Sequence, residues 1–90
     1  MQLISRKELL EKFELQQNQM TQIKVEGNFS IEMNFSKFSY NIEEDNLKMS
    51  DMMSNNFIVF SLNDINFMGI ENNEISCILN DKNDTMIKIK

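Results

Sequence analysis

The sequence predicts an α+β domain in which an N-terminal helix packs on a five- to six-stranded antiparallel sheet or on a small open barrel. Residues 23–35 alternate, with every odd position except Gly27 apolar and every even position polar, which is the period of a strand with one buried face. Ser5 and Glu8 have the spacing of a helix-capping box. Short apolar runs separated by Asn- and Asp-containing breaks fill the second half of the chain, as is typical of antiparallel strands.

Length and composition indicate one globular domain, residues 1–90. The chain is 41% hydrophobic and 26% charged, which is too apolar for a disordered protein. It has no proline, only two glycines and 13 asparagines. Such a composition is typical of an AT-rich coding sequence, so we interpret the asparagine content first as compositional bias.

The helix is predicted from about residue 6 to about residue 20. In the capping box, the Ser5 hydroxyl accepts a hydrogen bond from the amide of Glu8, and the Glu8 carboxylate accepts one from the amide of Ser5. We expect one stripe of this helix to face the core, formed by Leu9, Phe13 and Met20. The rest of the chain, from about residue 22 to residue 90, is predicted to be a β meander.

The alternating segment 23–35 is predicted to be one continuous strand that bends at Gly27. A two-residue turn at Gly27-Asn28 would set Glu26 opposite Phe29 and so pair a polar with an apolar side chain. A bent strand instead keeps all the apolar positions on one side of the sheet.

A hairpin is predicted at Ser36-Lys37. The apolar parity switches there, so a tight turn sets Phe35 opposite Phe38 on a shared face. Residues 43–46 then form a polar loop. Residues 47–56 are predicted to be a short strand or a helical turn, because their methionines fit helical spacing while their first residues also suit a strand.

The last part of the chain is predicted to form four strands, at residues 57–62, 65–70, 75–79 and 85–89. Across the polar loop 80–84, the core-face pairs are Cys77 with Ile87 and Ile75 with Ile89. The strand patterns together predict that the following side chains are largely buried: Phe29, Ile31, Met33, Phe38, Ile42, Phe57, Val59, Ile75, Cys77 and Ile87.

The side chains present exclude several kinds of chemistry. The chain has no histidine and one cysteine, so it cannot form a Ser-His-Asp or Cys-His arrangement or a His/Cys zinc site. Its two glycines are too far apart for a phosphate-binding loop. Two clusters of acidic side chains remain, one at residues 43–45 and one formed by Asp81 and Asp84. Both clusters fall in expected turns, and neither matches a calcium-loop pattern. We therefore expect no catalytic residue, no cofactor, no metal and no enzymatic activity.

The charge and the cysteine usage indicate the kind of environment and partner. The net charge is −5, with acidic residues spread along the chain, so direct nucleic-acid binding and docking on an anionic membrane are disfavoured. Charged residues at positions 6–8 argue against a signal peptide, and no apolar run is long enough to span a bilayer. The lone Cys77, expected to be a buried apolar residue, fits a reducing cytoplasm.

These observations favour a non-enzymatic small acidic protein that acts by binding another protein. A partner with a basic surface is expected, and the role of an inhibitor or regulator of a nucleic-acid-handling protein, as in a phage or other mobile element, would fit. The candidate contact residues are Glu43, Glu44 and Asp45, the densest negative patch in the chain. An uncovered sheet edge could also pair two copies of the chain.

One alternative comes from the layout alone. A helix followed by a bent, five-stranded antiparallel sheet is similar to the architecture of Sm-like small barrels, although no motif of that family is matched. The similarity implies an oligomer that binds RNA or a nucleotide. The basic residues expected at the RNA contacts of such a ring are missing from this acidic chain.

Overall fold

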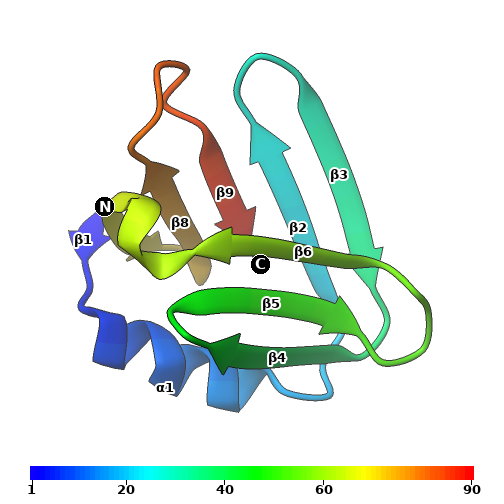
Figure 1. Cartoon of the computed structure of the whole chain (residues 1–90). Helices are drawn as coiled ribbons and strands as arrows, with labels where there is room; N and C mark the ends of the chain where they lie inside the picture. Colours follow the sequence, from blue (N-terminus) through cyan, green and yellow to red (C-terminus); the bar gives the residue numbers. More distant parts are fainter.

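The computed structural model describes residues 1–90 and confirms the α+β class, with one helix and nine strands in two antiparallel sheets (Figure 1). The elements are β1 (Gln2–Leu3), α1 (Arg6–Gln16), β2 (Thr21–Glu26), β3 (Ser30–Phe35), β4 (Phe38–Glu43), β5 (Asn46–Asp51), β6 (Phe57–Ser61), a 3₁₀ turn (Leu62–Asp64), β7 (Ile65–Glu71), β8 (Glu74–Leu79) and β9 (Met86–Ile89). The larger sheet has six strands in the order β1-β7-β8-β9-β2-β3, and the smaller has three in the order β4-β5-β6. The two sheets do not close into a barrel.

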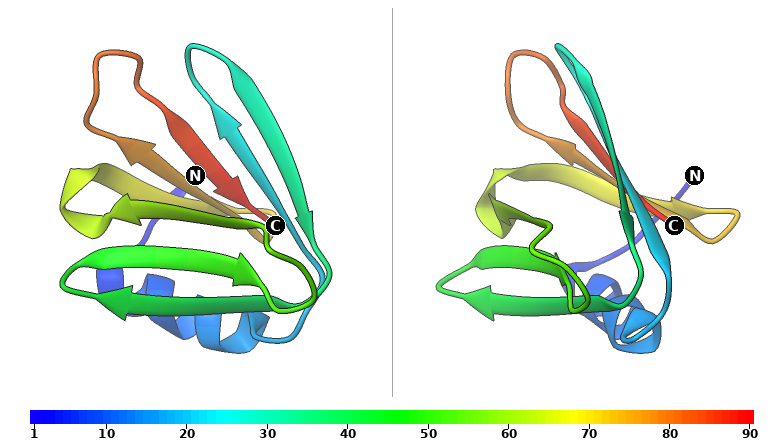
Figure 2. Two further views of the ribbon diagram at one scale, coloured as in Figure 1. Left: turned by 45° about the vertical axis from the view of Figure 1, so that its right-hand side comes forward. Right: turned by 90° about the vertical axis from the view of Figure 1, so that its right-hand side faces the viewer.

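The three-stranded sheet lies across one end of the six-stranded sheet, and α1 runs beside β4 (Figures 1 and 2). The space between these layers holds the core, which α1 and both sheets supply. Its buried apolar residues are Leu9, Phe13, Ile23, Phe35, Phe38, Leu47, Met49, Leu62, Ile75, Cys77, Ile87 and Ile89. The other end of the six-stranded sheet, including the β2–β3 hairpin, projects beyond the smaller sheet (Figure 2).

The capping box at the start of α1 is confirmed, with both reciprocal hydrogen bonds present at 3.1 Å. The predicted helix end near Met20 is wrong, because α1 ends at Gln16. Asn18 adopts the left-handed conformation with φ 68°, which a helix cannot continue through. Its amide then donates to the Phe38 carbonyl, which ties this segment to the edge of β4. Met20 is consequently 83% exposed instead of lying on the buried stripe.

The prediction of one continuous strand over residues 23–35 is also wrong, because β2 and β3 form a hairpin. Three residues, Gly27 to Phe29, separate the strands, and Val25 lies opposite Ile31. An odd number of loop residues keeps the apolar positions of both strands on the same face, whereas the two-residue turn would have mismatched them. The alternation was therefore read correctly, but the connection was not.

The predicted Ser36-Lys37 hairpin is not formed, since β3 and β4 belong to different sheets. Phe35 lies opposite Thr21 in the larger sheet, and Phe38 lies opposite Asp51 in the smaller one. Both phenylalanines still reach the core, from two layers instead of one. The Lys37 amide donates to the Asp51 carboxylate at 3.1 Å, so this connection turns a corner between sheets.

The first half of the stretch 47–56 belongs to strand β5, which forms a tight hairpin with β4. The polar loop predicted at residues 43–46 shortens to the two-residue turn Glu44-Asp45, whose φ angles are 51° and 69°. Positive φ at both central residues is what a type I′ hairpin turn requires. Residues 52–56, which contain two exposed methionines, then connect β5 to β6.

The C-terminal hairpin is confirmed in its predicted register, with Cys77 opposite Ile87 and Ile75 opposite Ile89. The strand order is not a simple meander, because β9 returns to pair with β2 and β1 pairs with β7.

The predicted core is correct for Phe38, Ile75, Cys77 and Ile87, which are buried, and Met33 and Ile42 are half-buried. It is wrong for Phe29, Ile31, Phe57 and Val59, which are exposed. The first two lie at the projecting end of the β2–β3 hairpin. The last two lie on the outer face of β6, whose partly buried inner residues are Ile58 and Phe60.

Candidate protein-binding face

The outer face of the three-stranded sheet carries the main candidate site, and we call it the β4–β6 face. Alternation along β5 places Leu47 and Met49 in the core. Lys48, the residue between them, must then point outward. The neighbouring strands continue this face with Asn41 and Val59, which lie opposite Lys48 on either side.

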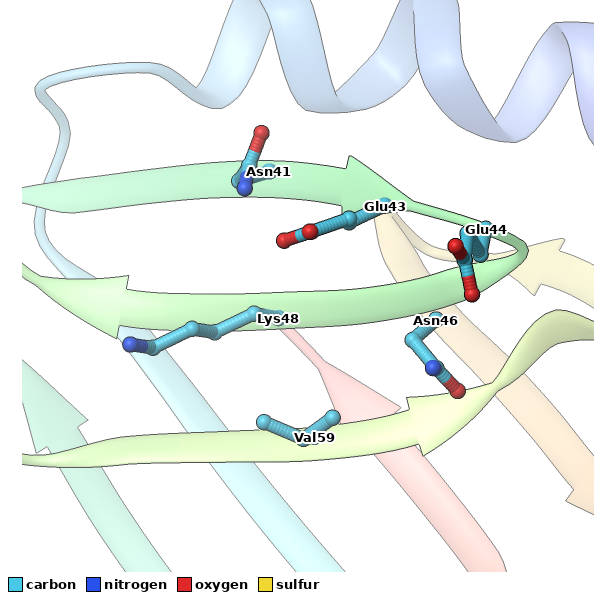
Figure 3. A pocket seen from close by; sticks show the side chains of 6 residues that line it. All are labelled: Asn41, Glu43, Glu44, Asn46, Lys48 and Val59. Carbon is cyan, nitrogen blue, oxygen red and sulfur yellow. The ribbon is translucent and has the colours of Figure 1, made fainter.

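A hollow of about 340 Å³ is centred on this face (Figure 3). Its lining residues come from all three strands and the β4–β5 turn: Asn41, Glu43, Glu44, Asn46, Lys48 and Val59. The ion pairs of the structure join the N-terminal amine to Glu71, Arg6 to Asp45 and Lys88 to Glu26. The charged groups of Glu43, Glu44 and Lys48 therefore have no ion-pair partner within the chain and are available to a ligand.

Exposed apolar side chains adjoin these charges. Phe57 is 56% exposed and Val59 is 48% exposed. The Lys48 ammonium lies 4.7 Å from the centroid of the Phe57 ring, a cation–π contact that holds both side chains on the face. A second hollow of about 400 Å³ continues past Lys48 and Phe57 toward the loop at residues 54–56. The β4–β6 face thus combines an aromatic anchor, an aliphatic side chain and charges of both signs.

Asp45, the third residue of the predicted acidic contact, has a different role. Its Oδ1 lies 2.7 Å from Nη2 of Arg6, and its Oδ2 accepts a longer hydrogen bond of 3.4 Å from Asn63. The hydrogen bond from Arg6 lowers the pKa of Asp45 below its ordinary value. The structure therefore splits the predicted trio: Glu43 and Glu44 line the hollow, while Asp45 ties the β4–β5 turn to the start of α1.

The edge of β6 adds unpaired backbone groups to this face. The register between β5 and β6 directs the N–H and C=O groups of Phe57 and Val59 away from β5. No other strand pairs with β6, and neither residue takes part in the other backbone hydrogen bonds of the chain. An extended segment of a partner could add to this edge while its side chains contact Phe57.

The other reactive groups have structural explanations. Cys77 is buried, and its burial raises the pKa of the thiol to about 12, so it is not a nucleophile at neutral pH. Asp81 accepts hydrogen bonds from the side chain and the amide of Thr85 and from the amide of Asn83, and these bonds shape the β8–β9 loop and lower the pKa of Asp81. Tyr40 donates a hydrogen bond to Glu14, which raises its pKa to about 12. No three His, Cys, Asp or Glu side chains gather as a metal site would need.

Glu43 and Glu44, which the sequence predicted as contact residues, line the hollow, whereas Lys48, Phe57 and Val59 were not among the predicted contact residues. The residues Asn46 to Asp51 do alternate, with apolar side chains at 47 and 49, and this pattern could have placed Lys48 outside. The apolar run Phe57 to Phe60 has no alternation, so its outer side chains could not be identified from the sequence.

The structure contains no helix with the length and hydrophobicity needed to cross a bilayer. Comparisons of the chain with protein-family models, with curated proteins and with solved structures gave no significant match.

Proposed function

We propose that this chain is a non-enzymatic protein-binding domain whose partner docks on the β4–β6 face. The observation that carries the proposal is the exposed Phe57–Val59 pair beside ion-pair-free charges and an open strand edge. Aromatic side chains are enriched at the centres of protein interfaces, and a Phe anchor with a polar rim has the usual anatomy of such a site.

The electrostatics favour a partner with a basic surface. Glu43 and Glu44 project from one end of the β4–β6 face, and the chain as a whole carries a net charge of −5. Such a charge raises the rate of association with a basic surface, because opposite potentials steer the encounter. An inhibitor or regulator that covers the basic surface of a nucleic-acid-handling protein would use these properties, as a small phage or mobile-element protein would.

A non-enzymatic role is supported by the state of the reactive groups. The chain has no histidine, its one thiol is buried, and the carboxylates with shifted pKa values, Asp45, Asp51 and Asp81, accept hydrogen bonds within the chain. A cytoplasmic location belongs to the same proposal, because an unpaired cysteine is typical of a reducing compartment. Open sheet edges also allow self-association, which the partner-binding proposal does not require.

Matched charge variants test the proposed contact. Affinity capture from the native host with the wild-type chain identifies the partner. Glu43→Lys/Glu44→Lys should then slow association and weaken its dependence on salt. The control, Glu71→Lys/Glu74→Lys, makes the same charge change at the β7–β8 turn of the other sheet and should slow association much less. Equal slowing by both double variants would show that net charge, and not the β4–β6 face, steers binding.

The apolar anchor is tested separately. Phe57→Ser should raise the dissociation rate, whereas Met20→Ser, which removes an even more exposed apolar residue elsewhere, should not. The alternative of an Sm-like oligomer that binds RNA or a nucleotide predicts a hexamer or heptamer that takes up RNA. Light scattering with and without RNA distinguishes the two, since a monomer or dimer indifferent to RNA supports the proposed protein-binding role.

A further inference from the structure

The edge strand β3 has a full row of unpaired backbone groups. Gln22 and Lys90 exchange both of their backbone hydrogen bonds. The N–H and C=O groups of even-numbered residues in β2 therefore point toward β9, and those of odd-numbered residues point toward β3. The N–H and C=O groups of Ser30, Glu32 and Asn34 must then point away from β2. None of them bonds to another part of the chain. Strand β3 lies at one margin of the molecule in Figure 1 and in the left view of Figure 2, and it faces the viewer in the right view of Figure 2.

The apolar rows that cross the six-stranded sheet end uncovered at this edge. One row runs from Cys77 through Ile87 and Val25 to Ile31, as the strand registers show. Cys77 and Ile87 are buried, but Ile31 is 45% exposed. Phe29, next on the same side of the hairpin, is 66% exposed. The apolar row therefore continues onto β3, where no further strand of the chain covers its side chains.

This edge lacks the usual protection. Isolated proteins blunt open edges with lysine, proline or bulges. Residues 27–35 contain no Lys, Arg or Pro, and the one charge, Glu32, accepts a 2.6 Å hydrogen bond from Gln22 of its own sheet. An open, regular and partly apolar edge of this kind favours pairing with a strand of another chain.

We propose that two copies of the chain pair through β3 as an antiparallel dimer, with Ile31 on the twofold axis. Strand Ser30–Phe35 of one copy then continues the six-stranded sheet of the other. The axis stands normal to the sheet, so the apolar faces of both copies lie on the same side. This dimer does not depend on the protein-binding role of the β4–β6 face.

The side chains select this register among those that the backbone allows. With Ile31 opposite Ile31, Phe29 of each copy lies opposite Met33 of the other, and Ser30 lies opposite Glu32. All the exposed apolar groups are then paired, and each Ser30–Glu32 pair exchanges two backbone hydrogen bonds. Moving the axis to Glu32 sets two carboxylates face to face, which is destabilising.

Moving the axis further, to Met33, fails for another reason. Phe29 would then lie opposite Lys37 of the other copy and stay uncovered. The shared strand pair would also lie closer to the end of β3 that leads into the three-stranded sheet of each copy. Ile31 is the second residue of β3 and so lies near the tip of the β2–β3 hairpin, which projects beyond the smaller sheet (Figure 2). An axis there would place the three-stranded sheets of the two copies at opposite ends of the shared strand pair.

Cysteine cross-linking tests the register. In the proposed dimer the two Ile31→Cys side chains form a non-hydrogen-bonded cross-strand pair, the closer of the two pair types, with Cβ atoms about 4.5 Å apart, within reach of a disulfide. Ile31→Cys should therefore form an intermolecular disulfide under mild oxidation, whereas Met33→Cys alone should not. A mixture of Phe29→Cys and Met33→Cys chains should cross-link as a heterodimer. The wild-type chain, with Cys77 buried, is the background control. Cross-linking of Met33→Cys alone in preference to Ile31→Cys would overturn the register.

Sedimentation equilibrium tests the dimer itself. The wild-type chain should show a concentration-dependent dimer, and Ile31→Lys should raise its dissociation constant at least about tenfold by placing two ammonium groups on the axis. Because Ile31 is partly exposed, circular dichroism should show that this variant stays folded. Val59→Lys, on the other open edge, should leave the dimer intact. A monomer at all concentrations, or a dimer unaffected by Ile31→Lys, would overturn the proposal and leave the partner-binding proposal untouched.

Discussion

Ile23 and Ile31 form a matched pair for testing which parts of the alternating segment belong to the core. Both point to the same side of the β2–β3 hairpin, one from each strand, and both would be truncated to Ala. Ile23 is fully buried, whereas Ile31 is 45% exposed. The same chemical change should therefore have two different costs.

The magnitudes follow from burial. Truncating Ile to Ala removes roughly three carbon atoms, each worth about 0.8 kcal/mol when fully buried, and leaves a cavity if the site is enclosed. Ile23→Ala should thus lower the free energy of unfolding by about 3–4 kcal/mol. Ile31→Ala loses about half the transfer term and leaves no enclosed cavity, so it should lower it by about 1 kcal/mol.

Urea melts at a concentration where the chain is monomeric measure both values. The two variants should keep the wild-type m-value and differ in midpoint. Repeating the melts at high concentration should enlarge the loss for Ile31→Ala only, because dimerisation stabilises the folded state by mass action. Equal losses for the two variants in the monomer would refute the conclusion that the hairpin tip lies outside the core.

Three further outcomes are expected. Ser5→Ala should destabilise α1 by about 1 kcal/mol, with faster amide exchange confined to its first turn, since the capping box is present. Asp51 accepts hydrogen bonds from the Met53 amide and from Lys37 and Ser54, which lowers its pKa in the folded state. The stability that this carboxylate contributes is therefore complete above its unfolded-state pKa of about 3.9 and is lost as the pH falls through the folded-state pKa. Thermal melts should show the wild type losing its advantage over Asp51→Asn below about pH 4. Cys77 should react with a thiol reagent at neutral pH only at the rate of unfolding, and prompt labelling of the native chain would contradict its burial.

The correct predictions concern features that are determined by neighbouring residues or by a complete apolar alternation. The Ser5–Glu8 spacing specifies hydrogen bonds between neighbours, so it needed no knowledge of the fold. The pairing of Cys77 with Ile87 was correct because the intervening loop is short and both strands have one unambiguous apolar face. Among the candidate site residues, Glu43 and Glu44 were selected because they belong to three consecutive carboxylates; the structure places both beside the hollow, and their role in binding stays a prediction.

The errors arose at residues whose position depends on how many sheets surround the core. Apolar parity shows that Phe35 and Phe38 both face a core, but it cannot show that they reach it from different sheets. The run from Phe57 to Phe60 is apolar at every position, so packing of the smaller sheet on the larger one decides that Phe57 is outside. Asp45 was separated from its neighbours by Arg6, a contact between residues 39 positions apart that no local pattern contains.

The turns of this chain give the asparagine content a physical role in addition to compositional bias. A chain with two glycines and no proline must build its turns from other residues, and neither glycine has a positive φ. The left-handed positions are taken by Asn18, Glu44, Asp45, Asn72, Asn73 and Asp84. Asn and Asp tolerate this conformation better than other non-glycine residues, because their short polar side chains can hydrogen-bond locally. Asn72-Asn73, both left-handed, close the β7–β8 hairpin as Glu44-Asp45 close β4–β5. Glu44 is the exception among these residue types, and its carboxylate lines the β4–β6 hollow.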